Sequence, residues 1–198
     1  METWIITGGA ASGKSTFCKL LAEGSPRVAS FSSDAAVHHI YQDKETASKL
    51  AHVLDESVVG PDGLVSRPAL RELAFRDPSM RGKLEKFLHP QVYAMLEDLQ
   101  ATSLEGGKVQ VLIAEVPLFY ESQSDFPADA VIVVASESKL QHDRMTGERG
   151  LNADTAQRIL DIQLPLRRKL DLADKVVWNE GSPELLRLQS QLLLQQLV

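Results

Sequence analysis

Several features that commonly define a protein are scarce in this chain of 198 residues. A single cysteine, Cys18, excludes an internal disulfide, and its place one turn into a predicted helix favours a small buried hydrophobe. No apolar run approaches the roughly 18 residues that span a bilayer, and no basic segment precedes the first apolar run. We therefore expect a cytoplasmic protein with no membrane partner. The five histidines are scattered or, like His38 and His39, adjacent on a predicted helix, which gives no set of metal ligands.

An excess of basic residues is missing as well. The net charge is −6, with 27 acidic against 21 basic residues, which argues against a nucleic-acid partner. Basic groups that matter for function must therefore be local. Hydrophobic residues make up 43% of the chain, enough for the core of a single α/β domain over residues 1–198 with room for an insertion.

Five short, nearly continuous apolar runs predict strands that helices cover on both faces. They lie at residues 4–7, 28–31, 109–116, 130–135 and 176–178. Helical sequence separates the runs, which predicts an α/β fold with a doubly wound, parallel, five-stranded sheet. The gap between the second and third runs is longer than a simple crossover needs. We interpret residues 36–104 within it as an inserted helical substrate-binding lobe, interrupted at Gly60–Gly63.

The first apolar run leads directly into Gly8–Thr16, which fits G-x-x-x-x-G-K-[ST] between a strand and a helix. Backbone N–H groups of such a loop converge on phosphate oxygens, and the positive end of the following helix adds to the attraction. Lys14 would reach the β- and γ-phosphates of ATP, and Ser15 would ligate Mg²⁺. The other residues that we expect to bind the nucleotide here are Gly9, Ala10, Ala11, Ser12, Gly13 and Thr16.

In open parallel sheets, ligands bind beyond the carboxyl ends of the strands. Asp34 follows the second strand and suits either a base for an attacking hydroxyl or the N-cap of a helix beginning at Ala35. Glu115 ends the third strand and suits either a magnesium ligand, through water, or a simple strand-end carboxylate. His89-Pro90 is typical of a helix boundary, with a substrate role as the lesser alternative.

Phosphoryl transfer requires positive charge near the transferred group and exclusion of water. Residues 141–168 are polar and rich in arginine, with two glycines that permit hinging, so we predict a lid that carries Arg144 and Arg149. We expect most of the later basic residues to be solvated or paired with acids such as Asp161 and Asp171. These residues are Arg158, Arg167, Arg168 and Lys169.

Together these motifs resemble the dephospho-coenzyme A kinase family over nearly the whole chain. The resemblance rests on T-G-G-x-x-S-G-K-S-T at 7–16, D-x-x-V-H at 34–38, D-G-x-x-x-R-x-x-L-R at 62–71, L-H-P at 88–90, P-L-F-Y-E at 117–121, E-R-G at 148–150 and the run 173–181, which ends in N-x-G. The first motif occurs in many unrelated nucleotide-binding proteins, whereas the ordered combination of the others is specific.

The resemblance implies the fold of P-loop nucleoside monophosphate kinases and transfer of the ATP γ-phosphate to the ribose 3′-hydroxyl of dephospho-coenzyme A. It implies that Asp34 is the base, that Arg144 and Arg149 join Lys14 at the phosphates, and that Asn179 and Gly181 lie by the adenine. The inserted helices and the turn after the third strand are implied to receive dephospho-coenzyme A. The residues expected to bind it are Asp34, His38, Arg71, His89, Pro117, Leu118 and Glu121.

Two positions depart from the pattern of that family. Ser32 stands where the first carboxylate of Asp-x-Asp is usual, and a hydroxyl cannot supply that negative charge. Ala10-Ala11 stand where Ile-Gly is common, and we expect Ala11 to keep an ordinary backbone conformation. Two other functions stay open, because fold does not fix the acceptor: another nucleoside or nucleotide kinase, or a nucleotide-dependent switch.

Overall fold

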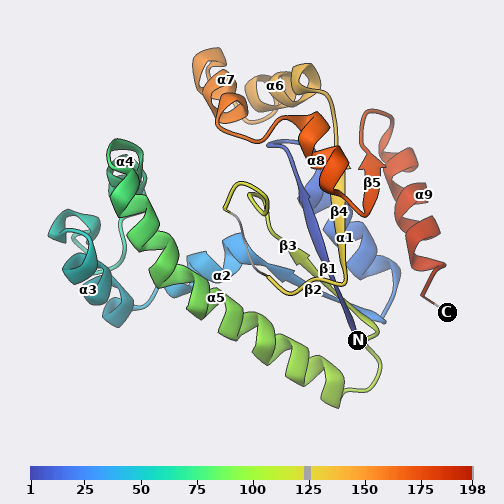
Figure 1. Cartoon of the computed structure of the whole chain (residues 1–198), viewed down its shortest axis with the longest axis horizontal. Helices are drawn as coiled ribbons and strands as arrows, with labels where there is room; N and C mark the ends of the chain where they lie inside the picture. Colours follow the sequence, from blue (N-terminus) through green and yellow to red (C-terminus); the bar gives the residue numbers. More distant parts are fainter. Residues whose placement is uncertain (123–125, 198) are drawn as a thin grey trace. The chain divides into compact units, whose positions relative to one another are not determined.

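The computed structural model describes residues 1–122 and 126–197 (Figure 1). The chain divides into two compact units. Residues 1–32 and 100–198 form the first, which we call the sheet unit, and Ser33–Leu99 form the second, which we call the helical unit. Within the described residues, no helix is both long and apolar enough to cross a membrane.

The sheet unit is built on five parallel strands in the order β2-β3-β1-β4-β5. They are β1 (Glu2–Gly8), β2 (Val28–Ser32), β3 (Val111–Glu115), β4 (Ala130–Ala135) and β5 (Lys175–Trp178). The predicted α/β fold with a parallel five-stranded sheet is therefore confirmed. Glu115 is in register with Ile6 on one side and with Ser32 on the other. The carboxyl ends of β1, β2 and β3 consequently meet at one edge, beside the loop that follows β1.

Helices α1 (Lys14–Gly24) and α9 (Pro183–Leu194) pack together against the sheet. Phe17 and Leu21 of α1 share one buried cluster with Leu186 of α9 and with apolar side chains of all five strands. Cys18 belongs to the same cluster and is 4% exposed, as predicted. Burial holds the pKa of its thiol above the usual range, and the carboxylate of Glu115 adds to the rise, so Cys18 stays protonated.

Further helices of the sheet unit lie between β4 and β5 in the sequence. They are α6 (Ser138–Gly147), α7 (Ala153–Asp161) and α8 (Leu166–Leu172). Figure 1 shows α6 and α7 lying together beyond the carboxyl ends of β1 and β4. Asn152 caps α7 by accepting a hydrogen bond from the N–H of Thr155, and Gly150 (φ 64°) makes the turn that separates α7 from α6.

The helical unit contains α2 (Ser33–Ile40), α3 (Lys44–Val53), a short 3₁₀ turn η1 (Glu56–Val58), α4 (Arg67–Arg76) and most of α5 (Pro78–Glu105). Asp43 and Ser66 cap α3 and α4 through side-chain oxygens that accept from backbone N–H groups. The helical sequence is interrupted by a small hairpin, in which Val59 and Val65 pair across a turn with Gly63 at φ 76°.

The helix boundary expected at His89-Pro90 is wrong, because α5 continues through Pro90 for 28 residues in all. Pro90 removes one N–H donor from the helix. Gln91 Nε2 donates to the carbonyl of Phe87 at 2.9 Å, which adds a hydrogen bond in the same turn. Side chains at helical spacing on both sides of the proline, Leu88, Val92 and Leu96, are buried. Their packing outweighs the local preference of proline.

Candidate active site

The loop between β1 and α1 is shaped by glycines with positive φ at its two ends, Gly8 (146°) and Gly13 (99°). Gly13 directly precedes α1, so the N-terminus of that helix opens at the loop. A Cβ on Gly13 would collide with Nδ2 of Asn179, the residue that follows β5. Asn179 Nδ2 donates to the carbonyl of Ser12 at 2.8 Å. The end of β5 is thereby fixed against the loop.

Ala11 does not keep the ordinary backbone conformation that we expected. Its φ is 54°, which makes it the only residue other than glycine with a positive φ among residues 1–122 and 126–197. A Cβ is disfavoured in this left-handed region because it crowds the following carbonyl. The methyl group of Ala11 is buried in one cluster with Met145 of α6 and Ala156 of α7. This packing compensates for the strained conformation.

The ammonium group of Lys14 lies against the backbone of the loop. Its Nζ donates to the carbonyls of Gly8 at 3.1 Å and of Gly9 at 2.8 Å, and the residue is 8% exposed. A positive charge held at the N-terminus of α1 is suited to bind an anion that the loop N–H groups also contact.

A hydroxyl and a carboxylate meet at the start of α1. Ser15 Oγ donates to Glu115 Oε1 at 2.6 Å, and Ser15 is exposed to solvent. One or two protein oxygens of this kind, completed by phosphate oxygens and water, are the usual ligands of Mg²⁺ in phosphoryl-transfer sites. This donor set fits the magnesium ion that we expected Ser15 and Glu115 to hold. Ser32, which replaces the usual carboxylate, stands beside Glu115 in the sheet.

Arg144 joins α6 to the loop and to the end of β5. Its guanidinium donates to the carbonyl of Ala11 at 3.2 Å and to the carbonyl of Asn179 at 2.9 Å. Arg144 also lines a cavity of about 410 Å³, a volume typical of ligand pockets. The residues around this cavity are Ala11, Gly13, Thr16, Leu20, Arg144, Glu148, Arg149, Asn179, Gly181, Pro183, Leu186 and Arg187. Both arginines of the predicted lid and both residues expected beside adenine therefore surround one cavity.

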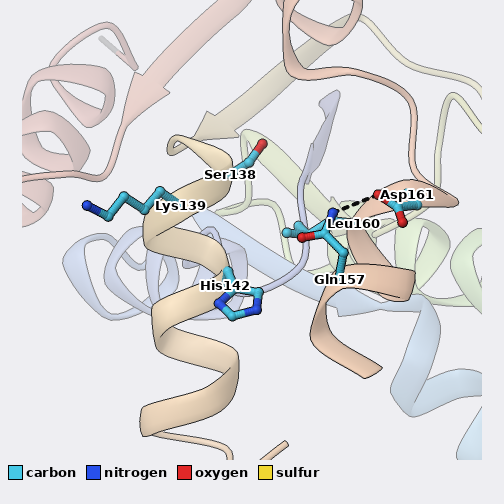
Figure 2. A pocket seen from close by; sticks show the side chains of 6 residues that line it. All are labelled: Ser138, Lys139, His142, Gln157, Leu160 and Asp161. Carbon is cyan, nitrogen blue, oxygen red and sulfur yellow. Dashed lines mark hydrogen bonds between the residues drawn. The ribbon is translucent and has the colours of Figure 1, made fainter. Parts of the chain in front are cut away.

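A second cavity, of about 360 Å³, lies between α6 and α7. Figure 2 shows His142 of α6 on the side that faces α7, Lys139 extending away from it, and Gln157 bonded to Asp161. None of these four was expected in the site. The ion pair between Arg168 and Asp171, at 3.9 Å, agrees with the expected pairing of the later basic residues.

The turn after β3 contains three of the residues expected to bind substrate. The carbonyl of Pro117 accepts from Thr7 Oγ1 at 3.3 Å, which ties the turn to the end of β1. Leu118 is 38% exposed. Glu121 is instead turned inward, where its Oε1 lies 2.7 Å from Nζ of Lys169 with the side chain only 9% exposed.

The remaining expected site residues belong to the helical unit. Asp34 and His38 are one turn apart on α2, so their side chains leave the same side of that helix. Helix α2 begins at Ser33, so Asp34 is its second residue rather than the N-cap. Arg71 lies exposed on α4, and His89 stacks on Tyr93 of α5 with ring centroids 5.9 Å apart.

Sequence reasoning missed three residues near the loop. Arg187 of α9 reaches the 410 Å³ cavity, Gln163 Oε1 accepts from the N–H of Ala10 at 3.0 Å, and Lys169 is 1% exposed. The burial of Lys169 could have been predicted from helical periodicity, because the residue lies on the same helical face as Leu166 and Leu170. Gln163 lies outside regular structure, where no periodicity could have selected it.

A glycine-rich loop after the central strand of a parallel sheet, with a lysine, a magnesium-type donor pair and two arginines around the adjoining cavity, defines the class of P-loop kinases. Comparisons with known proteins specify the family. A family model described as dephospho-CoA kinase matches residues 4–184. The dephospho-CoA kinase of Symbiobacterium thermophilum is 35% identical over 93% of this chain and 76% of its own length. That of Anaeromyxobacter dehalogenans is 36% identical over 91% of this chain and 85% of its own. The chain belongs to the dephospho-CoA kinase family.

Solved structures agree with this assignment. A Thermus thermophilus protein of known crystal structure superimposes with a TM-score of 0.84 at 28% identity, covering 100% of this chain and 98% of that one. Dephospho-CoA kinase from Campylobacter jejuni gives a TM-score of 0.62 at 26% identity over 98% and 96% of the two chains. Shikimate kinase from Acinetobacter baumannii, at 16% identity and a TM-score of 0.53, shares the fold alone.

Proposed function

We propose that this chain transfers the γ-phosphate of ATP to the ribose 3′-hydroxyl of dephospho-coenzyme A, as a cytoplasmic enzyme that uses Mg²⁺. The observation that carries the proposal is the pairing of Ser15 with Glu115 at 2.6 Å directly beside Lys14, in a chain of the dephospho-CoA kinase family. These groups supply the oxygen ligands and the positive charge that a transferring phosphoryl group needs.

The sheet unit holds ATP in this proposal. The loop N–H groups and Lys14 bind the β- and γ-phosphates. Ser15 and Glu115 would hold Mg²⁺, which would supply positive charge to the phosphates. Arg144 and Arg149, which line one cavity with Asn179 and Gly181, counter the charge that develops on the transferred group. Asn179 and Gly181 receive the adenine. The other nucleotide contacts are assigned to Gly9, Ala10, Ala11, Ser12, Gly13 and Thr16.

The helical unit and the turn after β3 take the acceptor. Asp34 accepts the proton of the 3′-hydroxyl while the hydroxyl oxygen attacks the γ-phosphorus, and the bond from that phosphorus to the β-γ bridging oxygen breaks to release ADP. His38 extends from the same side of α2 as Asp34, which supports a place for both at one ligand. The other proposed acceptor contacts are Arg71, His89, Pro117, Leu118 and Glu121.

The experiment is ATP consumption measured side by side with dephospho-coenzyme A, adenosine, AMP and no acceptor. We expect rapid turnover only with dephospho-coenzyme A, and mass spectrometry should find the added phosphate on the ribose. Faster turnover with adenosine or AMP would identify a different kinase, and slow turnover independent of any acceptor would identify a switch. Lys14→Ala should remove activity by several orders of magnitude, since it removes the loop's positive charge from the phosphates.

A further inference from the structure

A buried ion pair lies behind the phosphate loop. Lys169 Nζ and Glu121 Oε1 are 2.7 Å apart, with side chains only 2% and 9% exposed. Removing two charges from water is unfavourable, and apolar side chains of similar size would often pack as well or better. The pair is therefore weak evidence for stability, and its role is sought in the geometry that it imposes.

The geometry that the pair imposes concerns residues 163–169. Glu121 Oε1 accepts a hydrogen bond from the backbone N–H of Leu164 at 2.9 Å, in addition to its contact with Lys169. One carboxylate oxygen therefore holds two points of this segment, one on each side of Pro165. A segment fixed at two points and stiffened by proline has little freedom to shift.

Gln163 is the residue next to this anchor. Its Oε1 accepts from the N–H of Ala10 at 3.0 Å. The peptide bond that carries this N–H also carries the carbonyl of Gly9, to which Lys14 Nζ donates at 2.8 Å. Gln163 and Lys14 thus bind the two opposite polar groups of a single peptide. A small cavity of about 50 Å³ is lined by Gly9, Gln163 and Lys169 among others, which places the three around one space.

We propose that Gln163 is a positioning residue that orients the Gly9–Ala10 peptide and through it the ammonium of Lys14, and that the Glu121–Lys169 pair holds Gln163 in place. The inference rests on the proposed function. It assigns Glu121 to the anchor instead of to the acceptor, because its Oε1 contacts Lys169 and Leu164 within the protein and its Oε2 is buried as well. The phosphate loop is in this way coupled to the turn after β3, on the acceptor side of the site.

The first test compares Gln163→Leu with Gln157→Leu, a matched control at a solvent-exposed residue of α7 whose side chain bonds to Asp161. We expect Gln163→Leu to lower kcat and to weaken calorimetric binding of a non-hydrolysable ATP analogue by about tenfold or more, within the range that a 1 Å misplacement can cause. The KM for dephospho-coenzyme A should not change, and Gln157→Leu should match the parent. Equal nucleotide binding and kcat in the two variants would overturn the proposal.

The second test concerns the anchor. Glu121→Gln should reproduce the loss of nucleotide affinity, whereas a rise confined to the KM for dephospho-coenzyme A would restore Glu121 as an acceptor ligand and overturn the assignment. A lone buried charge can unfold the protein, so the double variant Glu121→Leu/Lys169→Met, which removes both charges, is measured as well. Adding Gln163→Leu to that double variant should cause no further loss, because both act through one peptide. Additive losses of nucleotide affinity would show that the Glu121–Lys169 pair does not act through Gln163, and would contradict the proposal.

Nucleotide binding by calorimetry needs no acceptor. A parent protein that binds ATP but does not phosphorylate dephospho-coenzyme A would therefore refute the proposed function while the effect of Gln163→Leu on nucleotide affinity still tests the positioning role.

Discussion

Ala11 carries a methyl group where the backbone adopts a conformation that glycine usually supplies, with φ at 54°. The left-handed region costs a residue with a Cβ roughly 1–2 kcal/mol. The buried methyl recovers about 0.8 kcal/mol through its contacts with Met145 and Ala156. Alanine also loses less chain entropy than glycine on folding. These contributions nearly cancel, so an alanine is tolerated at a position where a glycine is common.

The first prediction follows from this balance. Ala11→Gly should change the free energy of unfolding by less than about 1 kcal/mol, because relief of strain offsets the lost methyl contacts. Ala11→Val should lower it by at least about 2 kcal/mol, since a β-branched residue is a steric outlier at positive φ and overfills the cluster with Met145. Urea unfolding of the three proteins measures both effects. Equal stability of the valine variant would mean that the loop does not hold this conformation in solution.

The second prediction concerns Asp34, which lies exposed in the first turn of α2. Asp34→Asn should reduce kcat with dephospho-coenzyme A by at least about a hundredfold, because an amide cannot accept the proton of the hydroxyl. It should cost less than about 1 kcal/mol of stability, the usual value of a carboxylate near a helix N-terminus. Steady-state kinetics and thermal melts test the two parts separately. A kcat within a few-fold of the parental value would show that Asp34 is not the base, and Glu115 would then be the next candidate.

At the scale of whole elements, α6 and α7 are packed onto the phosphate loop through the cluster of Ala11, Met145 and Ala156. The exposed turn between the two helices, with Gly150 at φ 64°, carries Arg149. Within the predicted lid, the helices that carry Met145 and Ala156 are therefore held to the loop by apolar contacts. The turn that carries Arg149, which we call the tip of the lid, is exposed to solvent. Motion on nucleotide binding is expected at the tip.

The third prediction tests that motion by proteolysis. Trypsin cleavage after Arg149 should slow when a non-hydrolysable ATP analogue and Mg²⁺ are added, by up to about a hundredfold at a concentration 100 times Kd if cleavage requires the nucleotide-free form. Lys14→Ala, which should bind nucleotide weakly, serves as the control and should show little protection. Equal cleavage of the parent with and without nucleotide would contradict a lid.

The elements also show what sequence could and could not predict. The strands could be predicted because buried parallel strands are continuous apolar runs. The run 130–135, for example, has the same bounds as β4. The continuation of α5 through Pro90 could not be predicted from the sequence. It depends on the burial of side chains such as Leu88 and Val92, which stabilises the helix on both sides of the proline. Tertiary packing overrides the local conformational preference of a residue such as proline, and this packing is known only once the fold is known.

For the whole molecule, the phosphate loop with Lys14 and Ser15 could be predicted because a continuous motif defines it. The contact between Ser15 and Glu115 could be anticipated from the rule that ligands gather at strand ends. The bond from Gln163 to Ala10 could not, because it joins residues 153 positions apart through an irregular segment. Contacts of this kind depend on how elements pack, and no local pattern encodes them.

The fourth prediction uses the stability of the whole chain as a measure of its ligands. A ligand that binds only the folded protein adds about 2.7 kcal/mol at 100 times its Kd, which for a chain of this size raises Tm by roughly 5–10 °C. The non-hydrolysable ATP analogue with Mg²⁺ and dephospho-coenzyme A alone should each produce a shift of this order in differential scanning fluorimetry. Chelating Mg²⁺ should reduce the first shift, since Ser15 and Glu115 then lose the ion that links them to the phosphates. Lys14→Ala should lose much of the first shift and retain the second. A shift with the nucleotide but none with dephospho-coenzyme A would refute the proposed acceptor, and the reverse result would refute the assignment of the phosphate loop.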